Sequence, residues 1–482
     1  MFTRRSMLLA AAVTSCGAAF AAVPGVPAAH AAGDVHTGQA YDPASSYTMK
    51  WTRADAMKIM QTQNNPNVPP GANSLLPSLT MPAIPRNFPV MTDPNGKQVW
   101  VWDTWPLTDL QGNNVSYNGY NIIFSLVADP YAGYTFDDRH VHARIGYWYQ
   151  PSDKPTSGWT YGGQVFAGRT PATQAEWSGS AKIGKNGQFQ LFYTHMNFAD
   201  RSKPKAVITL SNGRIRTDHP ADGPALSITM GKDQPLLEPD GKWYQNVAQN
   251  PYYSFRDPAV FTDPANPGKT YMVFEGNTAG QRGAYQCQQS DLGASGENPA
   301  QVTASGANFQ MANIGLAVAT DRKLTSWKFL PPILSGNCVN DQTERPQFVI
   351  KNGKYYLFTI SHAFTYAAGL RGPDGLYGFV GDGIRSDFKP LNTSGLAMGN
   401  PTDLNLSPTD PRQNGRQYQS YSHYVMPGDL VESFIDDVDG RRGGTLAPTV
   451  KLNISGATTS VNQQLLPYGY IPSNVAVGHP GK

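Results

Sequence analysis

The hydrophobic positions of this chain, from Val99 onward, come mostly in short runs separated by turns. The runs are rich in β-branched and aromatic residues, which is typical of strands. They recur at intervals of roughly ten to thirty residues, with Asp-Pro and Gly clusters between them. This spacing argues against βαβ units and predicts a closed, all-β assembly. Examples of these runs are NIIFSLVAD, ARIGYWYQ, FQLFYTHM, KAVITLSNG, TYMVFEG, IGLAVATD, GLYGFVGD and YQSYSHYVM.

Turn-forming residues support the same picture. The chain has 48 glycines and 39 prolines, and Asn352-Gly353 in IKNGKYY predicts a type I′ hairpin. No fixed-period repeat is visible, so the periodicity permits a propeller with divergent blades but does not indicate one.

One amphipathic helix is expected early in the chain, in WTRADAMKIMQ. Thr52 is its expected N-cap, with Asp55 three residues later, and Met57, Ile59 and Met60 form the apolar side. The Pro-rich stretch that follows, NNPNVPPGANSLLPSLTMPAIPRNFP, predicts irregular chain wrapped over a surface.

Residues 1–31 are expected to be a signal peptide. Arg4-Arg5 precedes an apolar stretch, Met7–Val23, and a small-residue cleavage pattern ends at Ala31. The paired arginines fit either a Sec or a twin-arginine signal. The segment ending at Cys16 also loosely resembles a lipoprotein cleavage box. The protein is therefore predicted to be secreted or periplasmic, with no membrane association after cleavage.

Composition and charge exclude some partners. Charged residues make up 15% of the chain, and 38 basic residues against 35 acidic ones give a net charge of +3. This near-balance, without a Lys/Arg run, argues against nucleic acid or a membrane surface as a partner. We expect a monomer.

The mature chain would contain two cysteines, Cys287 and Cys338. In an oxidising compartment they could form a disulfide, and the alternative is two separately buried thiols.

Three carboxylates lie in unusual sequence settings. Asp103 lies in VWVWDTWPL, where three of the nine tryptophans fall within six positions. Asp257 lies in YSFRDPAVF and Glu344 in DQTERPQFV. Singly, such motifs are more often loops or solvated turns. Together with the aromatic residues they fit glycoside chemistry, which needs a nucleophilic carboxylate and a carboxylic acid.

Other motifs carry weaker signals. His140 and His142, in HVHAR, would share one face of an expected strand, where a polar face is more common than a metal site. Asp436–Gly440 (DDVDG) lacks the downstream Glu of a calcium loop and is more typical of a turn. Phosphate loops, H-E-x-x-H and nucleophile-elbow patterns do not stand out.

The motifs WDTWP, FRDP and DQTERP, in this order, resemble glycoside hydrolase family 68, which contains levansucrases, inulosucrases and related β-fructofuranosidases. The resemblance runs from about position 51 to about position 428, and its details are similar to the Gram-negative levansucrase branch. It implies a single five-bladed β-propeller with the active site in a central funnel, lined by the innermost strand of each blade. Carboxylates far apart in the sequence could then converge.

The resemblance also implies roles for these residues. Asp103 would be the nucleophile that attacks the fructosyl unit of sucrose, and Glu344 would be the acid/base. Asp257 would stabilise the transition state. Arg256 and Arg345 would position the carboxylates and donate to sugar hydroxyls.

Further residues match substrate-binding positions of the family. Trp102, Trp177 and Ser178 resemble the fructosyl-site wall and a partner of the nucleophile. Glu275, in VFEGN, resembles a carboxylate behind the site. For Trp177, core packing is the alternative.

Gln342, His362 and Tyr421 resemble contacts to the glucosyl unit or the acceptor, and core packing is again the alternative for Tyr421. Gln342 stands where Gram-positive members have Glu, and His362 where they have Arg. Both differences fit the Gram-negative branch.

The resemblance bears on metal binding as well. Many Gram-positive members hold calcium near the position of Asp341, with another Asp six residues before the stabiliser, where this chain has Pro251. We therefore expect no cofactor and no metal, and a Cys287–Cys338 disulfide in place of calcium.

The chain is accordingly divided into a signal peptide (1–31), a helix with a wrapping segment (32–98), a propeller (99–450) and a C-terminal tail (451–482). The implied activity is retaining transfer of fructose from sucrose to a growing β-2,6 fructan or to water. Alternatives are a member that makes oligosaccharides or β-2,1 links, a sucrose hydrolase, and an inactive carbohydrate-binding propeller.

Overall fold

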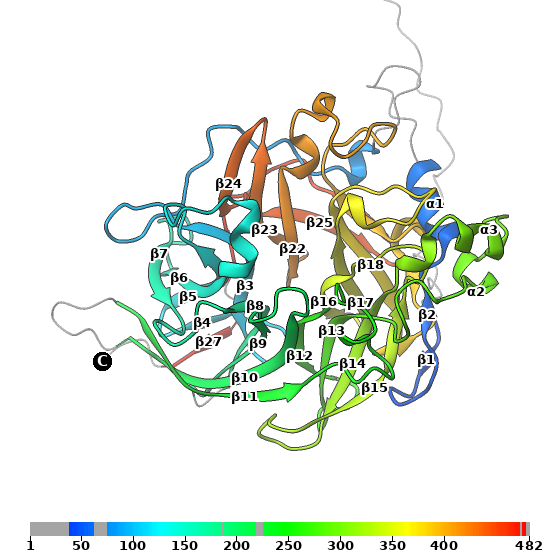
Figure 1. Ribbon diagram of the computed structural model, residues 1–482. Helices are drawn as coiled ribbons and strands as arrows, with labels where there is room; N and C mark the ends of the chain where they lie inside the picture. The colour runs from blue at the N-terminus through cyan, green and yellow to red at the C-terminus, as the bar shows by residue number, and fades with distance from the viewer. Residues whose placement is uncertain (1–37, 62–74, 185–186, 218–224, 473–474, 479–482) are drawn as a thin grey trace, which may run out of the picture. The chain divides into compact units, whose positions relative to one another are not determined.

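The short hydrophobic runs form antiparallel strands in a computed structural model of the chain (Figure 1). The structure describes residues 38–61, 75–184, 187–217, 225–472 and 475–478. The predicted signal peptide lies outside these residues.

Along the chain the strands form five consecutive groups, each of which starts with an inner strand, and the first two groups are joined in one ten-stranded sheet. The first group is β3 (Trp100–Thr108), β5 (Tyr120–Ala128), β6 (Arg144–Pro151) and β7 (Thr160–Gln164), with β4 (Val115–Tyr117) on β5. The second is β8 (Gln174–Ile183), β9 (Phe189–Asn197), β10 (Lys205–Arg216) and β11 (Ser227–Leu237). The third is β12 (Phe255–Thr262), β13 (Thr270–Asn277), β14 (Ala312–Ala319) and β15 (Trp327–Ser335).

The last two groups follow the same pattern. The fourth is β16 (Glu344–Lys351), β17 (Lys354–Ser361), β18 (Gly375–Gly381), β20 (Lys389–Pro390) and β21 (Leu396–Gly399). The fifth is β22 (Ser420–Met426), β23 (Leu430–Val438), β24 (Arg441–Leu446), β25 (Val450–Ser455) and β26 (Thr458–Val461). Short helical elements lie between strands: α2 (Gln289–Leu292), α3 (Pro299–Ala304), η1 (Pro77–Leu79), η3 (Ala307–Phe309), η4 (Ala363–Thr365), η5 (Leu391–Thr393), η6 (Pro411–Gln413) and η7 (Arg416–Tyr418).

The inner strands β3, β8, β12, β16 and β22 neighbour one another in turn and close a ring around the centre of Figure 1. This arrangement is that of a β-propeller, as predicted. A parallel pairing of Leu107 with Ala181 joins β3 to β8, so the first two groups form one ten-stranded sheet. A count of five blades therefore counts this sheet as two blades.

Every inner strand carries a register shift toward the second strand of its group. The shifts fall at Trp102/Trp105, Trp177/Gly179, Arg256/Ala259, Glu344/Gln347 and Tyr421/Tyr424. A β-bulge of this kind turns side chains out of the regular alternation. In four of the five, the residue inside the bulge has a positive φ: Asp103, Asp257, Arg345 and Ser422. The bulge is a structural repeat that the hydrophobic pattern does not reveal.

The N-terminal helix is confirmed as α1 (Arg53–Gln61). Thr52 Oγ1 accepts from the Asp55 amide at 3.2 Å, and Asp55 Oδ2 accepts from the Thr52 amide at 3.2 Å, which forms the expected reciprocal cap. Trp51, just before the helix, is fully buried and donates its indole N–H to the Ser394 carbonyl.

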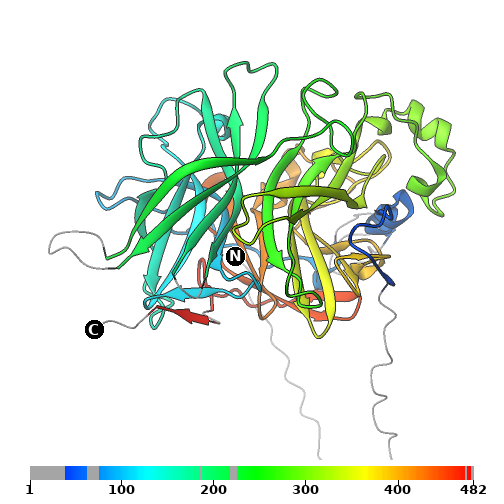
Figure 2. The ribbon, with the colours of Figure 1, turned by 90° about the horizontal axis from the view of Figure 1, so that it is seen from below.

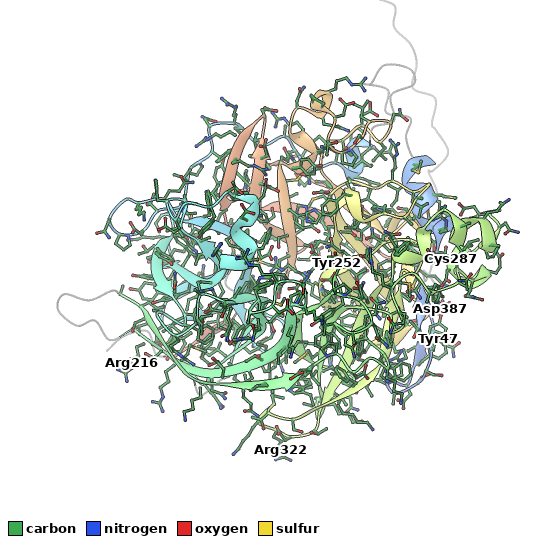
Figure 3. The ribbon with its side chains drawn as sticks, viewed as in Figure 1. Tyr47, Arg216, Tyr252, Cys287, Arg322 and Asp387 are labelled. Carbon is green, nitrogen blue, oxygen red and sulfur yellow. A yellow bond between two sulfur atoms is a disulfide. The ribbon has the colours of Figure 1, made fainter. Side chains whose placement is uncertain are left out.

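Short strands fasten the N-terminal segment to the third and fourth groups. β1 (Ala40–Tyr41) pairs with β19 (Arg385–Ser386), and β2 (Met49–Lys50) lies parallel to β15. The Tyr47 hydroxyl donates to Asp387 Oδ1 at 3.0 Å, and both residues lie together in Figure 3.

The predicted boundary at residue 450 needs correction. β25 starts at Val450 and pairs with β23, so the strands of the fifth group continue into the expected C-terminal tail. β27 (Val475–Val477) then pairs in parallel with β4, where the red strand lies beside the cyan one in Figure 2.

Local predictions had mixed outcomes. Asn352 and Gly353 both have positive φ, which confirms the type I′ hairpin. The strand expected at His140 and His142 is wrong: Asp137–His142 form a 3₁₀ helix, η2, at whose start Thr135 and Asp138 hydrogen-bond to each other. The expected turn in DDVDG lies at Asp439-Gly440, directly after β23.

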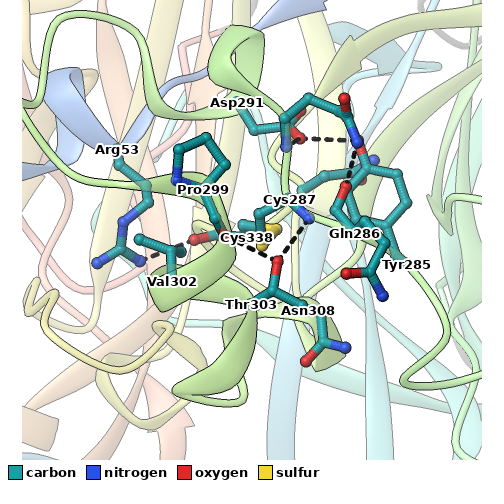
Figure 4. The surroundings of a disulfide bond; sticks show 12 residues. Arg53, Tyr285, Gln286, Cys287, Asp291, Pro299, Val302, Thr303, Asn308 and Cys338 are labelled. Carbon is teal, nitrogen blue, oxygen red and sulfur yellow. Dashed lines mark hydrogen bonds between the residues drawn. A yellow bond between two sulfur atoms is a disulfide. The ribbon is translucent and has the colours of Figure 1, made fainter.

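Cys287 and Cys338 form a disulfide, as predicted (Figure 4). Both residues are buried, and the Cys287 amide donates to Thr303 Oγ1 of α3 at 2.9 Å. The bond ties the segment carrying α2 and α3 to the segment that leads into β16.

The Asp341 carboxylate has hydrogen-bond partners within the chain. Met311 donates its amide to Asp341 Oδ1 at 3.1 Å, and burial raises the pKa of this carboxyl to about 6. Within the described ranges, no three His, Cys, Asp or Glu side chains are placed to hold a metal.

We expect the disulfide to stabilise this region. Replacing both cysteines by serine, or adding reductant, should lower the free energy of unfolding by about 4 kcal/mol, because the bond closes a long loop in the unfolded chain. EDTA should leave the melting temperature unchanged. Thermal unfolding with each additive checks this, and destabilisation by EDTA without an effect of reductant would contradict it.

Candidate active site

A cavity of about 540 Å³ opens at the end of the ring where the inner strands begin. Among its lining residues are eleven of the predicted site residues: Trp102, Asp103, Trp177, Ser178, Arg256, Asp257, Gln342, Glu344, Arg345, His362 and Tyr421. Glu275 lies directly behind Arg256. Nine of the eleven lie at the bulges of the five inner strands, while Gln342 precedes β16 and His362 follows β17.

Asp103 and Asp257 share one hydroxyl group. Ser178 Oγ is 2.7 Å from Asp257 Oδ1 and 3.4 Å from Asp103 Oδ2. Since a single hydroxyl reaches both, the two carboxylates face the same small space. Both residues have positive φ (46° and 63°), a region that Asp tolerates better than most side chains.

Two hydrogen bonds that involve backbone amides hold Asp257 in place. Its amide donates to Thr194 Oγ1 at 2.9 Å, and its Oδ2 accepts from the Arg345 amide at 3.2 Å. Burial raises the pKa of Asp257 to about 6; Arg256 opposes this rise, and the nearby Asp103 and Glu344 add to it.

Arg256 links three carboxylates. Its Nη2 lies 2.6 Å from Glu344 Oε1, and its Nε lies 2.6 Å from Glu275 Oε2 and 3.7 Å from Asp257 Oδ2. Glu275 is fully buried, and burial raises its pKa well above the usual range. The guanidinium therefore supplies the positive charge that lets several acidic groups occupy one buried space.

Glu344 is held as an ionised acceptor. The Tyr421 hydroxyl donates to its Oε2 at 2.6 Å, and Arg256 occupies its other oxygen. Burial alone would raise its pKa, but Arg256, His362, Tyr421 and Arg345 together outweigh burial and lower it.

Arg345 joins three inner strands. Its guanidinium donates to the Thr104 carbonyl of β3 and to both the carbonyl (2.9 Å) and the hydroxyl of Ser422 on β22. Its own backbone belongs to β16. These contacts give the predicted positioning role a structural basis, while donation to sugar hydroxyls stays a prediction.

His362 and Trp177, which both line the cavity, are each fixed by a polar contact. His362 Nδ1 is 2.9 Å from Asp374 Oδ2; burial lowers the pKa of this imidazole, but Asp374 outweighs burial and raises it. The Trp177 indole donates to the His140 carbonyl at 2.8 Å, and Arg256 lies 5.6 Å from its ring centroid. Trp177 stays partly exposed, whereas Trp102 and Tyr421 are buried.

Sequence reasoning missed part of the lining. Asp137, Arg139 and His140 enter from η2, and Asp436 enters from the end of β23. The guanidinium of Arg139 lies 5.1 Å from the Trp102 ring centroid. As a strand, HVHAR would place His140 and His142 on one face. His142 instead stacks on Tyr134, and His140 lies beside Trp102.

The model of the family described as Levansucrase/Invertase, glycoside hydrolase family 68, matches residues 40–472. The chain belongs to this family. A levansucrase of Gluconacetobacter diazotrophicus is 52% identical over 95% of this chain and 83% of the relative. Levansucrase LscA of Pseudomonas savastanoi pv. glycinea is 42% identical over 88% of this chain and 96% of the relative.

Solved structures of family 68 share the fold. The crystal structure of the G. diazotrophicus levansucrase superposes with a TM-score of 0.84 and covers 92% of this chain and 96% of that one. The β-fructofuranosidase catalytic domain of Microbacterium saccharophilum K-1 also has a TM-score of 0.84. It is 48% identical, and the match covers 92% of this chain and 97% of that one. The levansucrase of Bacillus subtilis has a TM-score of 0.71 and is 26% identical, and the match covers 88% of this chain and 98% of that one. The predicted family and the propeller fold are confirmed.

Arg345→Lys should destabilise this family 68 protein by about 2 kcal/mol. Lysine keeps the charge but cannot donate to Thr104 and Ser422 together, so a buried acceptor loses its partner. Urea denaturation measures the change. Arg412→Lys, at a guanidinium whose side chain is 72% exposed, is the control and should have almost no effect. Equal stability of the two variants would contradict the linking role of Arg345.

Proposed function

We propose that this protein is a levansucrase, which transfers the fructosyl unit of sucrose through a covalent intermediate to a growing fructan or to water. The observation that carries the proposal is the cluster of Asp103, Asp257 and Glu344 around Ser178 and Arg256, in a chain that belongs to family 68. A cavity of about 540 Å³ is within the size range of small-ligand sites.

In the first step, a carboxylate oxygen of Asp103 attacks the anomeric carbon of the fructosyl unit. The bond to the glucosyl oxygen breaks, and Glu344 gives its proton to that oxygen, so glucose leaves. Glu344 must be protonated when this happens. The free site holds it ionised, so the fraction that carries a proton falls as pH rises.

Asp257 stabilises the transition state directly, and Arg256 contributes by positioning Glu344. Positive charge develops on the fructosyl ring as the bond breaks, and the adjacent Asp257 carboxylate stabilises it. Ser178 keeps the orientation of Asp257 toward Asp103. Arg256 keeps Glu344 at the other side of the site.

In the second step, Glu344 removes a proton from an acceptor hydroxyl, which attacks the fructosyl carbon and releases Asp103. A fructan hydroxyl extends the chain, and water gives free fructose. Both outcomes use the same three carboxylates. Transfer to β-2,1 positions, formation of short oligosaccharides and simple hydrolysis are therefore the alternatives within the family.

The remaining predictions on location and partners belong to the proposal. The signal-like residues 1–31 support export to the periplasm or the medium. None of the helices in the described ranges is long and apolar enough to cross a membrane. We propose that the enzyme works as a monomer, with sucrose, fructan or oligosaccharide acceptors and water as its partners, and without a metal or other cofactor.

Incubation with sucrose tests the function. The wild-type protein should release glucose in excess of fructose and form β-2,6 links, as measured by sugar assays and NMR. Asp103→Asn should lower glucose release by at least about 10⁴-fold, because the amide is no nucleophile. Asn tolerates the positive φ, so the melting temperature should stay close to that of the wild type. Activity retained by this variant would overturn the nucleophile assignment, and β-2,1 links would favour the inulin-forming alternative.

Tyr421→Phe should move the alkaline limb of kcat/KM to higher pH by about one unit. Loss of the hydroxyl removes a donor to ionised Glu344, so the pKa of this carboxyl rises and it keeps its proton to higher pH. Tyr418→Phe is the matched control, since its hydroxyl donates to the Pro408 carbonyl outside the cavity. If the alkaline limb of kcat/KM stays in place or moves to lower pH in Tyr421→Phe, the role of Tyr421 as a donor to Glu344 is contradicted.

A further inference from the structure

Three aromatic rings form a stacked slab along one wall of the cavity. The ring centroids of Tyr421 and His362 are 3.7 Å apart with an interplanar angle of 20°, and those of His362 and Phe364 are 4.9 Å apart, also at 20°. The inner ring, Tyr421, is 4% exposed and touches Glu344 through its hydroxyl. The outer ring, Phe364, is 67% exposed. The slab thus runs from the acid/base to the solvent.

Phe364 is unusual among the exposed apolar side chains. Large exposed hydrophobic residues of the described ranges are Val90, Tyr131, Tyr252, Phe309 and Phe364. Within this set, Phe364 alone lines the cavity. An apolar ring that stays in water at the mouth of a polar site points to a ligand that covers it.

The turn that carries Phe364 is held rigidly. Both oxygens of the buried Asp374 are used there, one beside His362 Nδ1 (2.9 Å) and one by the Ala363 amide (2.6 Å). Thr365 donates to Asn340 Oδ1 at 2.7 Å. The ring is therefore preorganised, and little conformational entropy is lost when a ligand packs on it.

The chemistry of the reaction suggests the ligand. A sugar ring has an apolar C–H face that packs on an aromatic face, as in other carbohydrate sites with aromatic walls. An acceptor must place one hydroxyl at Glu344, so the rest of a longer acceptor extends away from Glu344 toward solvent. The slab follows this direction and ends at Phe364. Water, as an acceptor, has no part that reaches so far.

We propose that Phe364 is a specificity-determining residue for the acceptor: its free face binds a sugar unit of a fructan or oligosaccharide whose terminal hydroxyl lies at Glu344. This inference rests on the proposed fructosyl transfer. Binding there holds the acceptor in place while the fructosyl unit is on Asp103, and it raises transfer to sugar relative to transfer to water.

The test compares transfer to a sugar acceptor with hydrolysis in Phe364 variants. Sucrose is the donor and kestose is the added acceptor, and free glucose, free fructose and elongated products are measured. In Phe364→Ala and Phe364→Leu, the KM for kestose should rise about five-fold, and the ratio of transfer to hydrolysis should fall by a similar factor. Phe364→Tyr keeps a flat ring and should restore both values. Tyr131→Ala removes an exposed ring outside the cavity lining and should change neither.

The outcomes separate this inference from the proposed function. An unchanged KM for kestose in both Phe364→Ala and Phe364→Leu would overturn the acceptor role. So would a rise in the KM for sucrose as large as that for kestose, because Phe364 would then bind the donor. Absence of glucose release from sucrose by the wild-type protein would instead refute the proposed function. Melting temperatures of the variants show whether a loss comes from unfolding.

Discussion

The structure depends on one electrostatic constraint: four acidic side chains must lie close together in a largely buried space. Burial raises the pKa of Asp257, Glu344 and Glu275, and a nearby positive charge is needed to compensate for part of this rise. Arg256 supplies that compensation by binding Glu344 and Glu275 directly and by lying near Asp257. The same guanidinium therefore holds these carboxylates together and lowers the pKa of Glu344, the proposed acid/base.

The backbone satisfies this constraint through the bulges of the inner strands. A regular strand would point alternate side chains to opposite faces, so neighbouring residues such as Arg256 and Asp257 could not both serve one site. The bulge and its positive φ let them do so. Arg345 then fastens three of these distorted segments to one another through Thr104 and Ser422. Local backbone strain is thus offset by hydrogen bonds between strands.

Elements outside the ring of inner strands support the same site indirectly. The disulfide and α1 secure the segments next to β16, which carries Glu344. The stacked rings of Tyr421, His362 and Phe364 extend from Glu344 to the mouth of the cavity. The proposed chemistry at the centre and the proposed acceptor contact at the rim therefore meet at Glu344.

The sequence by itself determined the strand-rich class, the helix capped by Thr52 and Asp55, the Asn352-Gly353 hairpin and, by resemblance, the three carboxylates. These features follow from local periodicity, capping and turn chemistry, or from motifs whose residues are contiguous in the chain. Only the tertiary structure decided that η2 brings Arg139 and His140 to the site, that Arg345 links three strands, and that strands of the last group continue past residue 450. The reason is physical: each of these depends on hydrogen bonds and packing between segments that are distant in sequence, and local hydrophobic patterns carry no information about such partners.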